Sequence, residues 1–177
     1  GNLVNIGGLA AFRDLKELAC GTRGGVNKLA DLSALRGLPL EYLYVESARV
    51  QDLSFLRGMA LKRIAIVNCP LTDLSPLKDM TSLEELLLRG TEVKDLSPLK
   101  GLKIKRLNVA STRVFDLRPL SDLPLEDLDI SNSQIKDITF LRTMPLRRLN
   151  LARSRVFNFS PLKGLPLTSL NVEGTQF

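Results

Sequence analysis

Apolar residues recur along this chain with a period of 21 or 22 residues. Each copy opens with Leu-x-x-Leu-x-Leu or a close variant, and the alternation at its end is typical of a β-strand with one buried face. One short strand cannot bury its apolar side alone. The pattern therefore predicts copies stacked sideways into a parallel sheet, with strands about 4.8 Å apart. The openings lie at Leu40, Leu61, Leu83, Ile104, Leu125, Leu146 and Leu167.

The second half of each copy predicts a short return turn. An apolar residue stands at the eleventh position, followed by Asp-Leu-Ser-Pro-Leu or a variant, as at residues 73–77 and 95–99. A Ser before a Pro with preset φ is typical of a helix start, where we expect the hydroxyl to cap the turn. Only four to six residues follow before the next strand. This length favours a 3-10 turn over a full α-helix.

Incomplete copies stand at both ends of the chain. An earlier copy opens at Leu15, carries about four extra residues near residues 21–25, and resumes at Leu29. Residues 3–14 fit the back half of a still earlier copy, and the chain stops halfway through its last one. We therefore expect a single domain of about eight repeats over residues 1–177 that is a piece of a longer array.

These residues resemble the leucine-rich repeat family, and the Asp-Leu-Ser-Pro-Leu half resembles its bacterial internalin-type subclass. The resemblance implies a right-handed α/β solenoid, with a parallel sheet on the concave face and 3-10 turns on the convex face. It also implies recognition of a protein partner, at a bacterial surface or secreted. The family usually has Asn at the ninth position. Here Ser, Thr or Cys stands there, so we expect a weaker ladder of side chains or one made of hydroxyls.

Composition narrows the chemistry. The 177 residues contain no His, which excludes His-based nucleophile systems, His general bases and His-ligated metals. The two cysteines, Cys20 and Cys69, lie two predicted strands apart, about 10 Å, whereas disulfide Cα separations rarely exceed about 7 Å. We expect two free, buried thiols, which are as compatible with a cytoplasmic location as with a secreted one. We expect no cofactor or metal, and the lack of a run of 18 apolar residues predicts no transmembrane helix.

An enzymatic role is not expected. The best pair of carboxylates is Glu85 and Asp127, which the repeat places two strands apart at about 10 Å. Arg106 is predicted to lie between them and to favour their ionised forms. An open sheet face also excludes little water, so no carboxylate is poised as a general acid.

The third, fifth and seventh positions of each copy are expected on the concave face, with the second at its rim. From Lys62 onward, the second and third positions change sign with every strand, as in Lys62-Arg63 and Glu84-Glu85. Opposite charges on neighbouring strands favour each other, which predicts a self-neutralised charge ladder. The alternative is a striped recognition surface. Residues 106–109 recur at 148–151, so a duplicated unit of 42 residues accounts for part of this pattern.

Two aromatic clusters are candidate binding sites. Tyr42 and Tyr44, the only tyrosines, are predicted on one exposed strand face, and Tyr is enriched at binding hot spots. The alternative is that they cover a thin part of the sheet beside the Gly-rich insertion. The candidate protein-binding residues are Tyr42, Tyr44, Arg63, Val67, Leu87, Arg89, Arg106 and Arg148.

A second patch comprises Arg113, Phe115, Arg153, Arg155 and Phe157. Arg interleaved with Phe suits a peptide, or nucleobases that stack on the rings. The alternative is that the Phe rings pack on neighbouring loops while the Arg side chains are solvated.

Two charged columns flank the turns. Acidic residues precede them at Asp31, Asp52, Asp73, Asp95, Asp116 and Asp137, and basic residues follow at Arg36, Arg57, Lys78, Lys100, Arg142 and Lys163. This order suits the dipoles of the turns. The alternative is a convex basic stripe for nucleic acid or an anionic surface, in keeping with the net charge of +6. Two further alternatives are a structural spacer within a larger protein and self-association through the solenoid ends.

Overall fold

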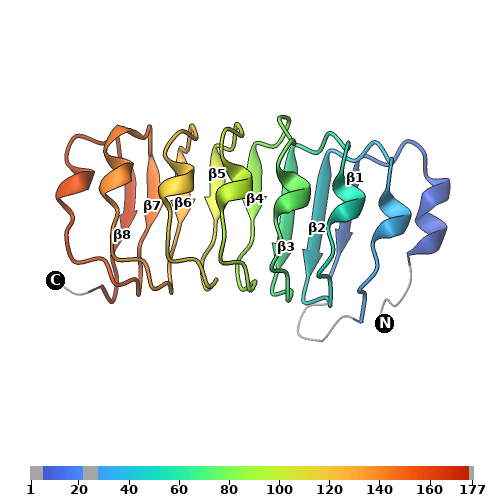
Figure 1. Ribbon diagram of the computed structural model, residues 1–177, viewed down its shortest axis with the longest axis horizontal. Helices are drawn as coiled ribbons and strands as arrows, with labels where there is room; N and C mark the ends of the chain where they lie inside the picture. The colour runs from blue at the N-terminus through green and yellow to red at the C-terminus, as the bar shows by residue number, and fades with distance from the viewer. Residues whose placement is uncertain (1–5, 22–27, 176–177) are drawn as a thin grey trace.

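A computed structural model describes residues 6–21 and 28–175. Within these residues, eight strands form one parallel sheet whose order follows the sequence from β1 to β8. Figure 1 shows the strands as one wall of an elongated solenoid and short turns as the opposite wall. The strands are Glu17–Cys20 (β1), Tyr42–Glu46 (β2), Arg63–Val67 (β3), Glu85–Leu87 (β4), Arg106–Asn108 (β5), Asp127–Asp129 (β6), Arg148–Asn150 (β7) and Ser169–Asn171 (β8).

The opposite wall consists of 3-10 turns, as the short return segments predict. Each described turn has three or five residues. No helix in the described part of the chain is both long and apolar enough to cross a membrane. The turns are Gly7–Ala11 (η1), Ser33–Leu35 (η2), Ser54–Leu56 (η3), Ser75–Leu77 (η4), Ser97–Leu99 (η5), Arg118–Leu120 (η6), Thr139–Thr143 (η7) and Ser160–Leu162 (η8).

The strand register follows the repeat position by position. Tyr42 pairs with Arg63, which pairs with Glu85, although the copy between the last two is one residue longer than the copy before it. The extra residue lies in the return segment near Ser82, whose Oγ donates to the carbonyl of Leu61 at 2.9 Å. A change of length is therefore absorbed outside the sheet, and equivalent side chains stay on one face.

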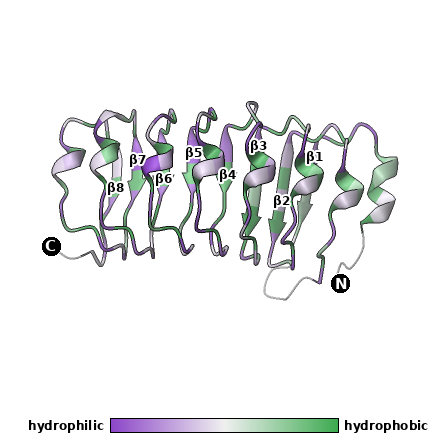
Figure 2. Ribbon diagram, in the orientation of Figure 1, coloured by the Kyte–Doolittle hydropathy of each residue, from purple (hydrophilic) through white to green (hydrophobic). Residues whose placement is uncertain are grey.

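The core lies between the two walls and is mostly aliphatic. Leu43, Ile64 and Leu86 from the strands are fully buried, as are Leu56 and Leu77 from the turns. Burial of such a side chain contributes about 1.5–3 kcal/mol, which chain entropy offsets. Figure 2 shows hydrophobic and hydrophilic residues interspersed along both walls. The buried hydrophobic residues of the two walls form one cluster between them.

An Asp organises each of the turns η2 to η7, and the expectation of a capping Ser hydroxyl is wrong. Ser75 is the first residue of η4, and Leu74 before it provides no side-chain cap. Instead, Asp73 Oδ1 accepts a hydrogen bond from the Ser75 N–H at 2.8 Å, and Ser75 Oγ donates to Asp73 Oδ2 at 2.8 Å. A carboxylate two residues before an N–H reaches it readily, as in Asx turns. The same backbone bond recurs at Asp31, Asp52, Asp95, Asp116, Asp137 and Asn158.

The hydroxyl groups at the ninth position form hydrogen bonds to the backbone of their own repeat. Thr91 Oγ1 and Thr112 Oγ1 donate to the carbonyls of Leu88 and Val109, each at 2.7 Å. In the next two copies, Ser133 and Ser154 accept from backbone N–H groups two residues later. These bonds do not form a ladder from repeat to repeat, so the copies are joined here by backbone bonds.

The eighth position is a sharp corner at which the chain leaves the strand. Its backbone has a positive φ in seven successive copies, a conformation that costs other residues more than Gly. The residues are Ser47, Asn68, Gly90, Ser111, Asn132, Arg153 and Gly174.

Candidate functional site

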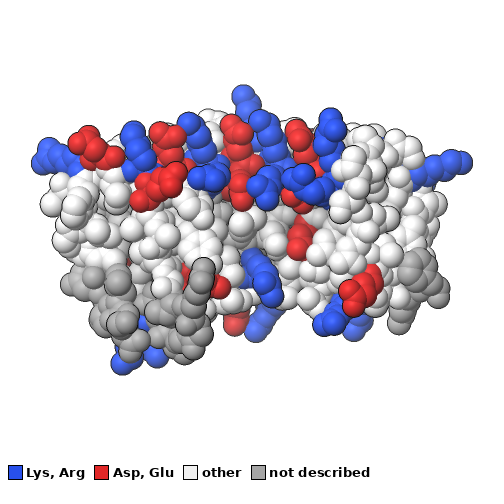
Figure 3. All heavy atoms as spheres, turned by 180° about the vertical axis from the view of Figure 1, so that it is seen from behind, with Lys and Arg blue, Asp and Glu red and all other residues white. Residues whose placement is uncertain are grey.

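The charge ladder of the sheet face is present as ion pairs between neighbouring strands. Figure 3 shows basic and acidic side chains alternating along the upper part of this face, where the strands begin. At the rim, Glu41 accepts from Lys62 Nζ at 2.7 Å, and Glu84 lies 3.2 Å from Lys105 Nζ. Exposed pairs of this kind contribute about 0–1 kcal/mol each. Their clearest effect is to neutralise the face rather than to stabilise the fold.

Arg106 lies between Glu85 and Asp127, as the repeat predicts. Its Nη1 is 3.3 Å from Glu85 Oε2, and its Nε is 3.4 Å from Asp127 Oδ2. Arg148 Nε reaches the same Asp127 oxygen at 2.9 Å. The two carboxylates are thus held as ion-pair partners in a row of alternating charges.

The two tyrosines lie on β2 and are each held by a charged neighbour. The Arg63 guanidinium is 4.4 Å from the centre of the Tyr42 ring, a cation–π arrangement. The Tyr44 hydroxyl donates to Glu46 Oε2 at 2.6 Å. Both tyrosines are half-buried. The rings are therefore positioned before any partner arrives, yet they keep accessible surface.

Apolar side chains continue from the tyrosines along the face. Tyr44 pairs with Ala65, which pairs with Leu87, and Val67 stands opposite Glu46. Val67 and Leu87 are half-buried, whereas Ala65 is buried. We call Tyr42, Tyr44, Ala65, Val67 and Leu87 the tyrosine patch. Ala65 was missed in the sequence, where its signal is a small residue between two large ones at the fifth position.

Gly21 allows the chain to approach the tyrosine patch from the N-terminal side. A Cβ on Gly21 would lie 3.2 Å from Glu46 Cβ and 3.6 Å from Tyr44 Cε1. A side chain here would press on the residues that hold Tyr44. The rest of the Gly-rich insertion, from residue 22 onward, lies outside the described residues.

The C-terminal half of the same face is polar. In β5, Asn108 Oδ1 accepts from the Ala110 N–H at 2.9 Å, and Asn108 Nδ2 donates to Asp129 Oδ2 at 3.2 Å. These side chains hold the chain where it leaves each strand, as Asx turns do. The sequence signal is an Asn or Asp at the fifth position of four successive copies. This row, which the sequence reasoning missed, contains Asn108, Asp129, Asn150 and Asn171.

The structure divides the predicted protein-binding set. Tyr42, Tyr44, Arg63, Val67 and Leu87 lie together on β2 to β4. Three other candidates stand apart from this group. Arg106 and Arg148 lie on β5 and β7 beside the polar row, where both are engaged by Asp127. Arg89 follows β4 and is exposed.

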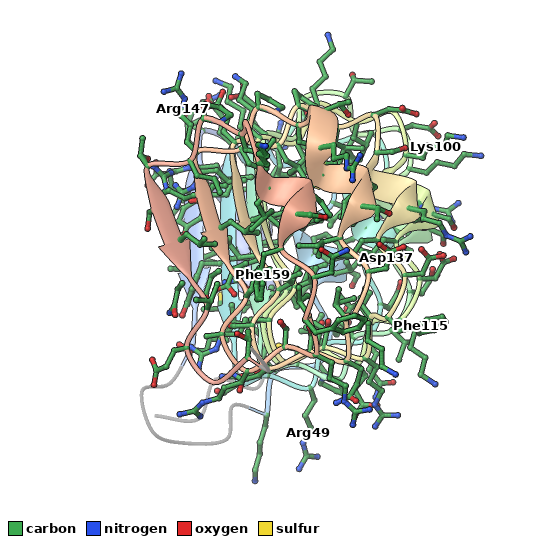
Figure 4. The ribbon with its side chains drawn as sticks, turned by 90° about the vertical axis from the view of Figure 1, so that its left-hand side faces the viewer. Arg49, Lys100, Phe115, Asp137, Arg147 and Phe159 are labelled. Carbon is green, nitrogen blue, oxygen red and sulfur yellow. The ribbon has the colours of Figure 1, made fainter. Side chains whose placement is uncertain are left out.

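The second predicted patch lies away from the concave face. Figure 4 shows Phe115 and Lys100 on the side of the molecule opposite the sheet. Phe115 and Phe157 are 70% and 66% exposed, so neither ring is buried against a neighbouring loop. Arg113 is paired with Glu92 at 3.1 Å, and Arg155 and Arg153 are exposed.

The basic column after the turns is exposed throughout. Arg57 and Lys78 line a hollow of about 600 Å³ whose floor includes Met59 and Met80. Asp79 lines the same hollow, and the carboxylates of the acidic column lie at the start of the turns. The turn face therefore carries both signs of charge, which weakens its attraction for a continuous polyanion.

Both cysteines are free and buried, as predicted. Burial raises the pKa of the Cys20 and Cys69 thiols. The Cys69 thiol also donates to the carbonyl of Val67 at 3.3 Å. Across the described residues, no three acidic or cysteine side chains gather in a way that would hold a metal ion.

Comparisons with known proteins agree with this architecture. No protein-family profile and no curated protein matches the sequence. Among solved structures, an internalin (InlF) from Listeria monocytogenes matches with a TM-score of 0.85 and 28% identity, over 99% of this chain and 52% of its own. Internalin C2 (InlC2) of the same bacterium matches with a TM-score of 0.86 and 26% identity, over 97% of this chain and 76% of its own.

A plant ice-binding protein also matches, with a TM-score of 0.77, over 97% of this chain and 60% of its own. At 19% identity it shows the fold alone. The chain spans about half the length of the InlF chain. The repeat pattern, the open parallel sheet with its 3-10 turns and the two internalin matches show that the chain folds as a leucine-rich repeat solenoid similar to those of the internalins.

Proposed function

We propose that this chain is a non-catalytic interaction module that binds a protein partner on its concave face, with the tyrosine patch as the anchor. An internalin-type leucine-rich repeat fold supports a protein-interaction module in general. The observation that carries the finer proposal is the contrast within the face. In the tyrosine patch, Tyr42, Tyr44, Val67 and Leu87 present accessible aromatic and aliphatic surface. The rest of the face is occupied by ion pairs and Asx turns.

The physical basis is the balance between burial and ordering. Tyr supplies a large rigid area with a polar tip and loses little conformational freedom on binding. Tyr42 is held by Arg63 and Tyr44 by Glu46, so part of that freedom is already lost in the free protein. Pre-organised aromatic anchors of this kind lower the cost of association. The flanking ion pairs form a polar rim, as in many protein interfaces.

The experiment is a capture of partners at physiological salt from a lysate and a surface fraction of the source organism. The parent chain is compared with Tyr42→Ala/Tyr44→Ala, and each captured protein is purified and titrated against both. Loss of at least about 2 kcal/mol of binding free energy in the double variant is expected, because hot-spot residues contribute that much.

A matched control removes an aromatic side chain from another face. Phe115→Ala deletes an exposed ring opposite the sheet and is expected to leave this affinity unchanged. Equal affinity of the parent and the Tyr42→Ala/Tyr44→Ala variant for the purified partner would refute the concave-face proposal. Capture of nucleic acid alone, with loss on Arg57→Glu/Lys78→Glu, would instead support the basic stripe. Capture of nothing would favour a structural spacer.

A further inference from the structure

Residues 92–94, 113–115, 134–136 and 155–157 form a second ribbon on the flank of the solenoid, after the corner at the eighth position. Inward side chains at the ninth and eleventh positions, such as Thr112 and Val114, are buried, whereas the tenth and twelfth positions point outward. The Arg113 N–H donates to the carbonyl of Val93 at 3.0 Å, and the Arg155 N–H donates to that of Ile135 at 3.0 Å. The middle two copies are joined at the corner just before the ribbon, where the Ser111 N–H donates to the carbonyl of Ser131 at 3.0 Å. Successive segments therefore follow one another at about strand spacing.

The twelfth positions of this ribbon alternate between a cation and an aromatic ring. The four successive residues are Lys94, Phe115, Lys136 and Phe157, which we call the Lys/Phe row. All four are exposed. With one segment every 4.8 Å or so, the two rings lie about 10 Å apart, with Lys136 between them. Such exposed rings in line are unlike Phe55, which is buried in the core.

The Lys/Phe row is bordered by basic residues on the side of the tenth positions and by Asp95, Asp116 and Asp137 on the side of the turns. Arg113 and Arg155 stand at the tenth positions beside it, and Glu92 is the acidic residue at those positions, already paired with Arg113. Within the described residues, Lys94, Lys136 and Arg155 make no ion pair. These cations are therefore available to an acidic ligand.

A shallow hollow adjoins the first ring of the row. It has a volume of about 260 Å³, and its apolar walls are Phe115, Phe140 and Leu117. Asp116, Arg118 and Asp137 form its rim, and Figure 4 shows Phe115 and Asp137 on the same flank of the molecule. Its volume suits one apolar side chain.

We propose that the Lys/Phe row is a second binding surface, independent of the concave face, for an acidic extended protein segment that carries two apolar residues. An extended segment in the polyproline II conformation rises about 3.1 Å per residue with three residues per turn, so apolar residues three positions apart lie on one side of it, about 9.3 Å from each other. This spacing matches the 10 Å or so between Phe115 and Phe157. Acidic residues between and beside them would face Lys136, Arg113 and Arg155. One segment can thus place its acidic groups near these cations and an apolar side chain in the hollow beside Phe115.

A single-stranded nucleic acid fits the same row less well. Its bases would stack on the rings, but its phosphates form a continuous line of negative charge. Asp116 and Asp137 lie beside that line. Side-chain hydrogen bonds from Arg118 lower the pKa of Asp116 to about 2, and the backbone N–H of Thr139 lowers that of Asp137. Both stay charged at neutral pH, where a peptide can space its acidic groups to avoid them and a phosphate backbone cannot.

The test is a selection from a phage-displayed library of dodecapeptides. Each peptide carries two apolar residues three positions apart, with Asp, Glu, Ser or Gly elsewhere, and the best clone is synthesised with a fluorescent label for anisotropy titration. Saturable binding to the parent chain is expected. Phe115→Ser/Phe157→Ser is expected to weaken it by at least about tenfold, because both apolar anchors are lost. Both rings are exposed, so the thermal melting point of this variant should match that of the parent.

Matched charge variants locate the site. Lys136→Glu is expected to weaken the peptide, whereas Lys100→Glu, the same change at an exposed position outside the row, and Tyr42→Ala/Tyr44→Ala are not. Three results would overturn the proposal. These are no enrichment over a library with shuffled spacing, equal binding by Phe115→Ser/Phe157→Ser, or tighter binding of oligothymidylate that displaces the peptide and is lost in the same variant.

Discussion

The Arg63 guanidinium lies 4.4 Å from the centre of the Tyr42 ring, on the neighbouring strand of the concave face. Arg63 also reaches Glu17 on the other side of β2, with Nη2 and Oε1 3.6 Å apart. The arginine therefore lies over the ring, with 49% of its side chain still exposed. This geometry joins the charge ladder to the tyrosine patch.

A double-mutant cycle between Tyr42 and Arg63 is expected to show favourable coupling. An exposed cation–π pair contributes about 0.5–1 kcal/mol, so the destabilisation of Tyr42→Ala/Arg63→Ala should be smaller than the sum of the two single variants by that amount. Urea unfolding of the four proteins gives the coupling free energy. A parallel cycle between Tyr42 and Arg148, which lie five strands apart, should give none. Equal coupling in both cycles would contradict a direct contact.

Gly90→Ala is expected to destabilise the fold more than Gly101→Ala does. Both glycines have positive φ, which costs an Ala about 1–2 kcal/mol. A Cβ on Gly101 would meet nothing within 4 Å, whereas one on Gly90 would lie against Asn68 Oδ1 and 3.4 Å from Asn68 Cα. Urea midpoints measure the difference.

The Asn68→Ala background separates strain from contact at this corner. Removal of the Asn68 side-chain amide should reduce the extra loss of unfolding free energy caused by Gly90→Ala. It should leave the loss caused by Gly101→Ala unchanged. If both glycine variants cost the same in the parent chain, the close approach between the eighth positions of neighbouring repeats has no energetic effect.

Asp116→Asn is expected to flatten the loss of stability in acid. Hydrogen bonds from Arg118 lower the pKa of Asp116 to about 2 in the folded chain, against about 3.9 in an unfolded one. A depressed carboxyl pKa gives stability that is present above about pH 4 and is lost as the pH falls towards 2. Thermal melting points at pH 4 and pH 2 measure the difference.

The substitution should leave the turn intact, because Asn158 at the equivalent position accepts the Ser160 N–H at 3.0 Å without a charge. Arg118→Ala should give an intermediate slope, since the backbone N–H of residue 118 still bonds to Asp116. An Asp116→Asn variant with the same loss as the parent between pH 4 and pH 2 would assign that loss to other groups.

The two thiols are expected to be unreactive in the folded protein and fully reactive after unfolding. Cys20 is 5% exposed and Cys69 is 2% exposed, and burial raises both pKa values, which lowers the fraction of reactive thiolate. Ellman's reagent at neutral pH, with and without urea, counts them. Cys20 lines a hollow on the first strand, so it should react before Cys69. The Cys20→Ala variant identifies the faster phase, and a faster Cys69 would contradict this order.

Local patterns were enough to predict much of the site. Tyr42 and Tyr44 alternate with buried Leu43 and Val45, so their common face follows from the period of a strand. The opposite signs of successive copies, as at Glu84 and Lys105, likewise predict which strands exchange ion pairs. Ala65 and the row of Asn and Asp side chains were harder to find. The role of these small and polar residues depends on their neighbours on the adjacent strands and at the strand ends, which the repeat pattern does not specify.

The sequence by itself determined the solenoid. When repeats of nearly constant length carry inward apolar positions in register, they can bury these positions by stacking side by side. Each copy then covers the apolar side of the next copy. Only the tertiary structure decided what the outward side chains do. It showed that Asp rather than Ser holds the turns η2 to η7, that Asp127 engages both Arg106 and Arg148, and that Phe115 and Phe157 remain exposed. The apolar period constrains the inward face, whereas the outward side chains follow no such period. Their contacts depend on geometry, either between neighbouring repeats 21 positions apart, as for Arg148 and Asp127, or within one turn, as for Asp73 and Ser75.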